Sequence, residues 1–146
     1  MAAAAAAVFA GVATAGLSWH EIAGGSTAQS SLHTPKAYVA LTPVEERSWL
    51  HRLSARDRAT VTGVNLAKDV VVATFLDGAP CSTNATVTGL TRTGRTLVVT
   101  ISYKLPPPGV ALCVRASTPY LVVGVARASL GGVRPNRVSL VLHARV

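Results

Sequence analysis

The amino-acid sequence predicts a mainly β protein of the α+β class, a small antiparallel β-sandwich or barrel with one helix. Valine runs interspersed with Thr and Ser are typical of strands, because β-branched side chains pack well on a pleated surface. Twelve Gly and eight Pro residues punctuate these runs, and both are turn formers. Turn signals recur about every ten residues, with no helical crossover between strands, which favours antiparallel pairing.

The chain begins with an apolar run, residues 2–17, that is too short to span a membrane as a helix. The small residues of Ala13-Thr14-Ala15 have the spacing that signal peptidase prefers. We therefore expect a signal peptide at residues 1–15, an exported protein, and a single domain at residues 18–146. Because the start lacks the usual positive charges, an uncut segment that anchors the protein to the membrane is the alternative.

The first part of the domain predicts two short strands and then the helix. Strands are expected at residues 18–23 and 38–41, with a loop of Gly, Ser and Thr between them. Thr42 has the chemistry of a helix N-cap, a proline follows it, and Glu45 completes a capping box. These signals predict a helix over Pro43–Leu53 that covers one side or one end of the β structure.

The rest of the chain predicts strands separated by turns. They are expected at Asp69–Leu76, Ala85–Leu90, Thr96–Lys104, Ala111–Arg115, Leu121–Arg127 and Arg137–His143. In this interpretation the segment from Asp69 to Val87 is a hairpin, which consists of a strand, a turn and a second strand. The turn is a candidate contact site for a partner, formed by Gly78, Ala79, Pro80, Ser82 and Thr83.

The same turn contains Cys81, and Cys113 is the only other cysteine. In an exported chain an even number of cysteines favours pairing. A bond between these two would close a loop of about 33 residues and add about 3 to 4 kcal/mol in the chain-entropy model. The alternative, a nucleophilic cysteine, requires an activating neighbour, and the sequence indicates none. We expect a disulfide between Cys81 and Cys113.

Neither a catalytic set nor a metal site is indicated by the sequence. The four histidines lack metal-site spacing to one another, to a cysteine or to an acidic residue. Serine occurs in neither GxSxG nor SxxK, and no glycine-rich loop of the phosphate-binding kind is present. The sequence therefore predicts a protein that is not an enzyme and that uses no metal or other cofactor.

Charge is distributed unevenly along the chain. The net charge is +8, and all six acidic residues precede Gly78. Such asymmetry favours an anionic partner, which could be cell-envelope polymer, an acidic protein surface or nucleic acid. Nucleic acid is disfavoured because no aromatic residues alternate with the basic ones. The alternative is that these are ordinary solvated positions on strands. The candidate basic surface consists of Arg92, Arg95, Arg115, Arg127, Arg134 and Arg137.

Taken in order, these features resemble the C-terminal domain of PrcB, an accessory subunit of a secreted bacterial protease complex. The resemblance covers nearly the whole domain. After the proline of the turn the family tends to have Thr-Gly-Gly-Tyr, whereas this chain has Cys81-Ser82-Thr83-Asn84, so any partner contact that the family makes through that Tyr is not carried over. The matching segments are Ser18–Ile22, Tyr38–Ala40 before the helix with Glu45, Asp69–Pro80 as VVxxFLGxxP, Thr96–Tyr103 as LxVxI, Cys113, and Thr118–Tyr120 opening a strand that ends near Val125.

The resemblance implies a non-catalytic, extracytoplasmic module that binds or stabilises another protein, with a secreted protease as the expected partner. Two alternatives stay open. One is a small β-sandwich protease inhibitor that presents the turns at Gly78–Thr83 and Lys104–Gly109. The other is a basic domain that binds anionic cell-envelope polymer through the arginine-rich half.

Overall fold

The structure is a computed structural model that describes residues 17–28, 34–77, 83–104 and 117–145. It confirms a mainly β, sandwich-like fold of the α+β class, with two sheets and two short α-helices in the described segments. In chain order these elements are β1 (Trp19–Ala28), β2 (Lys36–Ala40), α2 (Pro43–Leu50), α3 (Ala55–Thr62), β3 (Asp69–Phe75), β4 (Thr83–Thr93), β5 (Thr96–Lys104), β6 (Ser117–Ala126), the 3-10 helix η1 (Arg127–Leu130) and β7 (Arg137–Arg145).

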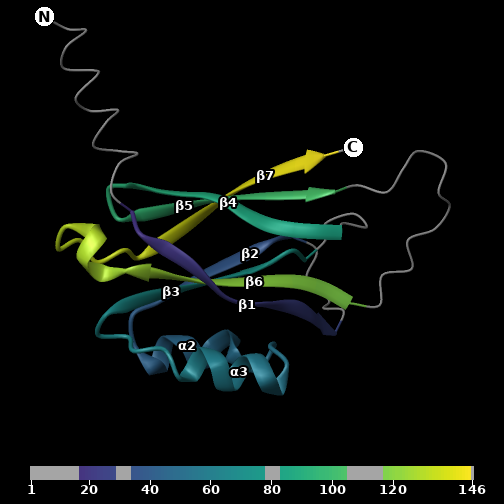
Figure 1. The fold of residues 1–146 in the computed structure, drawn as a ribbon, viewed down its shortest axis with the longest axis horizontal. Coiled ribbons are helices and arrows are strands. Elements are labelled where there is room, and N and C mark those ends of the chain that lie inside the picture. The colour runs from purple at the N-terminus through teal and green to yellow at the C-terminus, as the bar shows by residue number, and fades with distance from the viewer. Residues whose placement is uncertain (1–16, 29–33, 78–82, 105–116, 146) are drawn as a thin grey trace, which may run out of the picture.

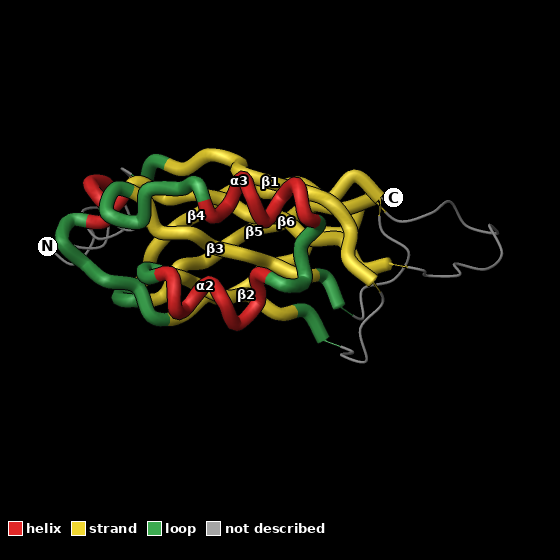
Figure 2. Tube along the Cα trace, turned by 90° about the horizontal axis from the view of Figure 1, so that it is seen from below, coloured by secondary structure: helices red, strands yellow, loops and turns green. Residues whose placement is uncertain are grey.

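The elements form three layers (Figure 1). The middle layer, which we call the central sheet, has the order β1-β6-β3-β2, and all its neighbours are antiparallel. One of its faces is covered by α2 and α3, the helix layer, as Figure 2 shows from below. The outer sheet, with the order β4-β5-β7, packs on the other face.

The central strands β3 and β6 are buried on both faces, which explains their nearly continuous apolar sequences. In β3, Val70 and Val72 pack with the residues of the outer sheet, whereas Val71, Ala73 and Phe75 pack under the helices. Alternation along one strand thus supplies two separate hydrophobic cores. The central sheet is the common wall between them.

The predicted hairpin from Asp69 to Val87 is wrong. β3 pairs with β2 and β6 in the central sheet, whereas β4 pairs with β5 in the outer sheet. β3 is buried at six of its seven positions, so it needs strands on both sides and a layer on each face. β4 alternates between inward apolar and outward Thr positions, as expected of a strand with one exposed face. The chain therefore changes sheets between these strands.

The prediction of a single helix is also wrong, because α3 follows α2 after a short link. Ser54 caps α3 by accepting a hydrogen bond from the Asp57 backbone N–H at 3.2 Å. Only Val61 of this helix is buried, so the sequence carries little apolar periodicity to reveal it. The predicted cap of α2 is confirmed: Thr42 Oγ1 accepts from the Glu45 backbone N–H at 3.4 Å.

The expectation of purely antiparallel pairing fails at one place, because β5 and β7 are parallel. The crossover that parallel strands require is supplied by β6, which lies in the central sheet, rather than by a helix. The strand predicted at residues 18–23 is present as β1, an edge strand, but it continues through residues 24–28, where a loop was expected. The predicted signal peptide and the predicted strand Ala111–Arg115 lie outside the described residues. No helix in the described segments is long and apolar enough to cross a bilayer.

Candidate interaction surface

Most of the predicted contact turn lies outside the described residues, namely Gly78, Ala79, Pro80 and Ser82, together with both cysteines and Arg115. Thr83 is the first residue of β4 and pairs with Lys104. The disulfide between Cys81 and Cys113 and the role of the turn in binding therefore stay predictions.

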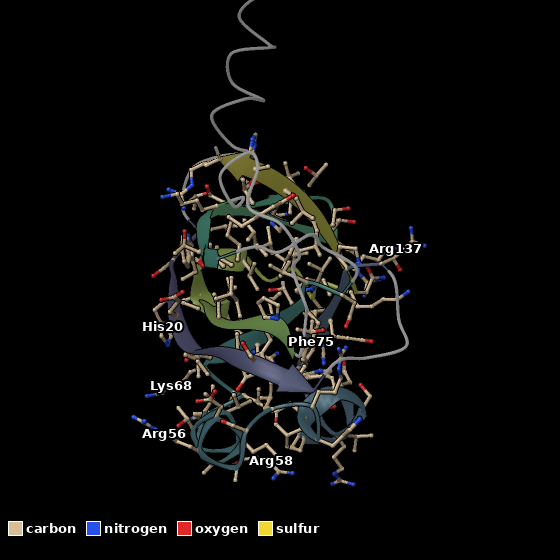
Figure 3. All side chains as sticks on the ribbon, turned by 90° about the vertical axis from the view of Figure 1, so that its right-hand side faces the viewer. His20, Arg56, Arg58, Lys68, Phe75 and Arg137 are labelled. Carbon is tan, nitrogen blue, oxygen red and sulfur yellow. The ribbon has the colours of Figure 1, made fainter. Side chains whose placement is uncertain are left out.

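A buried ion pair lies directly before this turn. Asp77 is fully buried, and its Oδ1 is 2.7 Å from Arg52 Nη2. The Arg52 guanidinium also lies over the Phe75 ring, 4.0 Å from its centroid, and Figure 3 shows Phe75 inside the molecule. Because both partners are largely withdrawn from water, losing either one leaves an uncompensated buried charge. The pair fixes the residue from which the turn begins.

The helix layer makes a second polar contact with the central sheet, through Tyr120 of β6. The Tyr120 hydroxyl donates a hydrogen bond to the Asp57 carboxylate and accepts one from the Ser54 backbone N–H at 3.2 Å. A glycine on β1 makes room for it, because a Cβ at Gly25 would lie 2.8 Å from the Tyr120 hydroxyl oxygen. The start of α3 is thereby attached to the sheet.

Four of the predicted basic residues gather at one end of the outer sheet, where the β4–β5 turn meets the start of β7. Arg95 Nε donates to the Arg134 carbonyl at 3.0 Å. The Arg95 carbonyl accepts from the Asn136 backbone N–H at 2.9 Å. Arg92 closes the β4–β5 turn by donating to the Gly94 carbonyl at 2.9 Å. The parallel register then places Arg137 beside Thr96. We call Arg92, Arg95, Arg134 and Arg137 the basic cluster.

Arg127 lies apart from the basic cluster. It is half-buried, and its Nη2 donates to the Leu41 carbonyl at 2.8 Å. Its Nε is buried and has no hydrogen-bond partner in the described part of the chain. This arginine ties η1 to the chain before α2, so we leave it out of the surface.

A groove of about 300 Å³ adjoins the basic cluster between β2, α2 and the start of β7. Both signs of charge line it. Glu45 is exposed, and its Oε1 accepts from Thr42 Oγ1 at 3.1 Å. Arg137 is also exposed and forms no ion pair within the described residues; Figure 3 places it on the side opposite Arg56. The lining residues are Ala37, Tyr38, Val39, Glu45, Ser48, Asn136, Arg137 and Val138.

The two outer layers differ in their charge. Every strand of the outer sheet follows Asp77, the last acidic residue of the sequence. Its charged side chains are therefore all basic: Arg92, Lys104, Arg137 and Arg145 on the strands and Arg95 in the turn. The helix layer carries both signs, with Glu45, Glu46 and Asp57 among Arg47, Arg52, Arg56 and Arg58.

One acidic side chain of the helix layer is buried without a full set of partners. Glu46 is 4% exposed, and its Oε1 has no hydrogen-bond partner in the described segments. Burial raises the pKa of Glu46 above its ordinary value of 4.5, because the charged form loses its hydration. This carboxyl group faces the interior and does not line the groove.

Sequence reasoning did not find the groove, the Arg52–Asp77 pair or the Tyr120 contact. Tyr38 and Asn136, which line the groove together, are about a hundred positions apart, and no local pattern links such residues. The Ser54-x-x-Asp57 spacing, a weak N-cap signal, could have revealed α3. Within the described residues no three His, Cys, Asp or Glu side chains form a group that could hold a metal ion.

Comparison of the chain with models of protein families, with curated proteins and with solved structures finds no match. The resemblance to the PrcB domain therefore rests on the sequence features alone.

Proposed function

We propose that this protein is a non-catalytic interaction module that binds an acidic region of a partner protein through the outer sheet. The observation that carries this proposal is the segregation of charge between the layers. The outer sheet has only basic charges. The end of β4, the β4–β5 turn, the segment before β7 and the start of β7 bring four arginines together at one end of it. A surface with a single sign of charge attracts partners of the opposite sign and orients them as they approach.

The groove supports a protein partner in preference to a uniformly anionic polymer. Glu45 and Arg137 line the same groove, and a polyanion that approached Arg137 there would also meet the Glu45 carboxylate. A protein surface carries both signs of charge and can place one against each. Cell-envelope polymer remains the second candidate, because the basic cluster itself would attract it.

A secreted protease is the partner that we propose, and an extracytoplasmic location goes with it. The support is the resemblance to the PrcB domain together with the predicted signal peptide. In this role the chain would stabilise the protease by binding its folded form, since any ligand that binds only the native state raises its apparent stability.

The test is capture of the partner by the full chain from the extracellular and envelope fractions of its host, with identification by mass spectrometry. The triple variant R95E/R134E/R137E should lose the captured protein, whereas R56E/R58E, which reverses two exposed arginines of α3, should retain it. Equal retention by both variants would contradict binding through the outer sheet.

The same sample separates the candidate functions. If the captured protein is a protease, its half-life and its rate on a small substrate are measured with and without the chain. A longer half-life at an unchanged rate supports the interaction module, and a lower rate supports the inhibitor. Capture of polymer alone, abolished at high salt, would support the polymer-binding alternative.

A further inference from the structure

The edge strands of the two sheets are not equivalent. β1 and β2 form the edges of the central sheet, and β4 and β7 form those of the outer sheet. The pairing of β1 shifts once, the pairing of β4 shifts twice, and β2 has only five residues. Bulges and short lengths are features by which proteins prevent other strands from adding to an edge. By contrast, the nine residues of β7 pair with β5 without a shift.

β7 presents a regular row of backbone groups on its free side. Among the described strands it pairs only with β5, so about half of its N–H and C=O groups point away from that partner. Its first residues line the groove together with β2, and the two strands diverge toward the C-terminal end of β7 (Figure 1). Val141, in the middle of β7, is 40% exposed. The free side is therefore long enough, and regular enough, to pair with another strand.

We propose that β7 takes an extended segment of a partner protein as an additional strand, and that this segment carries an acidic side chain for Arg137. This inference rests on the proposed function, since it specifies how the outer sheet holds a protein. Addition of a strand gives affinity through main-chain hydrogen bonds, and side-chain sites give specificity.

Charge complementarity determines the kind of segment. β7 has an arginine at each end, Arg137 and Arg145, and no acidic residue. In the antiparallel pair of two β7 strands that overlap along their whole length, Arg137 of each copy lies opposite Arg145 of the other. Like charges directly opposite each other destabilise a strand pair. A second copy of β7 offers no acidic side chain to Arg137, whereas an acidic segment does, so the edge favours a different protein over a second copy.

The groove determines where the acidic side chain is held. Arg137 has a planar guanidinium that can bind a carboxylate through two parallel hydrogen bonds, and Ser48 and Asn136 add polar groups to the lining. Glu45 on the helix side repels a carboxylate. An incoming acidic side chain is therefore directed to the β7 side of the groove, next to the edge with which its backbone pairs.

The probe is the acetylated and amidated peptide Asp-Val-Thr-Val-Thr-Val-Thr-Val-Asp, added to the full chain. Hydrogen–deuterium exchange followed by NMR should show slowing at alternate amides between Val138 and Ala144, which are the amides that face away from β5. The R137E variant should weaken binding about tenfold or more, in keeping with loss of a charged pair and its replacement by a repulsive one. R58E, the matched reversal on α3, should bind as the unchanged chain does.

Two further peptides control for nonspecific attraction. The same peptide with both Asp replaced by Lys should bind much more weakly. The same peptide with N-methylated amides keeps its charge but cannot form the ladder, so it should not slow exchange in β7.

Binding that leaves all β7 amides exchanging as before would overturn strand addition while leaving the proposed function intact. Equal loss by R137E and R58E would overturn the role of Arg137. Slow alternate amides in the chain without peptide, together with a concentration-dependent dimer in ultracentrifugation, would assign the edge to a second copy and contradict the proposal. Failure of the triple arginine variant to lose its natural partner would, by contrast, contradict the proposed function itself.

Discussion

The helix layer and the outer sheet cover opposite faces of the same sheet, and each packs on it through an apolar core, but only the helix layer adds buried polar contacts within the described residues. The helix layer sends polar groups into the interior, through Arg52 to Asp77 and through Ser54 and Asp57 to Tyr120. The outer sheet is attached through apolar side chains such as Leu97, Val99 and Ile101, which are fully buried.

This difference indicates what the charges of each layer do. In the helix layer, charged groups with partners in the sheet position the helices and the start of the turn after β3. In the outer sheet, the charges lie at strand ends and in the turn, and no acidic residue of that sheet neutralises them. Charges of the first kind contribute to stability, whereas the exposed Arg137 of the outer sheet is available to another molecule.

The largest effect is expected from breaking the buried ion pair. R52A leaves the Asp77 carboxylate buried without its partner, so the free energy of unfolding should fall by about 3 to 5 kcal/mol. Urea denaturation followed by circular dichroism measures this. R47A, which removes an exposed arginine of α2, is the control and should change stability by less than about 0.5 kcal/mol. A similar small change for R52A would show that the helix layer is not held by this pair.

A smaller loss is expected at the second polar contact. Y120F removes the hydroxyl that bonds to Ser54 and Asp57, which should lower stability by about 1 to 2 kcal/mol. Y103F removes a hydroxyl from the outer sheet, where no hydrogen bond of this tyrosine is found in the described residues, and should have little effect. Thermal unfolding measures both losses of stability. Equal losses from Y120F and Y103F would contradict a specific stabilising role for the Tyr120 hydrogen bonds.

The buried carboxyl group of the helix layer should make stability depend on pH. The pKa of Glu46 is raised by burial, so the folded chain holds this proton to a higher pH than the unfolded chain does. Stability is therefore lost as pH rises from the ordinary value of 4.5 through the folded pKa. E46Q removes the cost of ionisation and should stabilise the protein at pH 7, with a benefit that shrinks toward pH 4. Urea unfolding of the unchanged chain and of E46Q at pH 7 and pH 4 measures this benefit. A stabilisation by E46Q that is as large at pH 4 as at pH 7 would contradict ionisation of Glu46 as its cause.

The smallest effect on stability is expected for the outer sheet's charges. R137E should change the free energy of unfolding by no more than about 0.5 kcal/mol, because the side chain is exposed. Differential scanning calorimetry of R137E, with R58E as the control, measures this change in stability. A large destabilisation would show that Arg137 contributes to stability, as the buried charges of the helix layer do.

Much of the fold was accessible from the sequence because it depends on local chemistry. The cap at Thr42 and the strand Thr96–Lys104 agree with the structure. α3 was not predicted, because a helix that buries only Val61 shows little periodicity of apolar residues. Of the candidate site, the sequence indicated the arginines and their uneven distribution. It did not indicate the groove, because Tyr38, Ser48 and Asn136 meet only after the two sheets have packed.

The sequence by itself determined the mainly β class, the capped first helix and the separation of acidic from basic residues. These follow from side-chain propensity, turn chemistry and composition, which act within a few residues. Only the tertiary structure decided that β3 and β4 belong to different sheets, that β5 and β7 run parallel, and that Arg92, Arg95, Arg134 and Arg137 share one end of a sheet. The physical reason is that burial on both faces and pairing between distant strands depend on how the whole chain fills its two cores, which no single segment encodes.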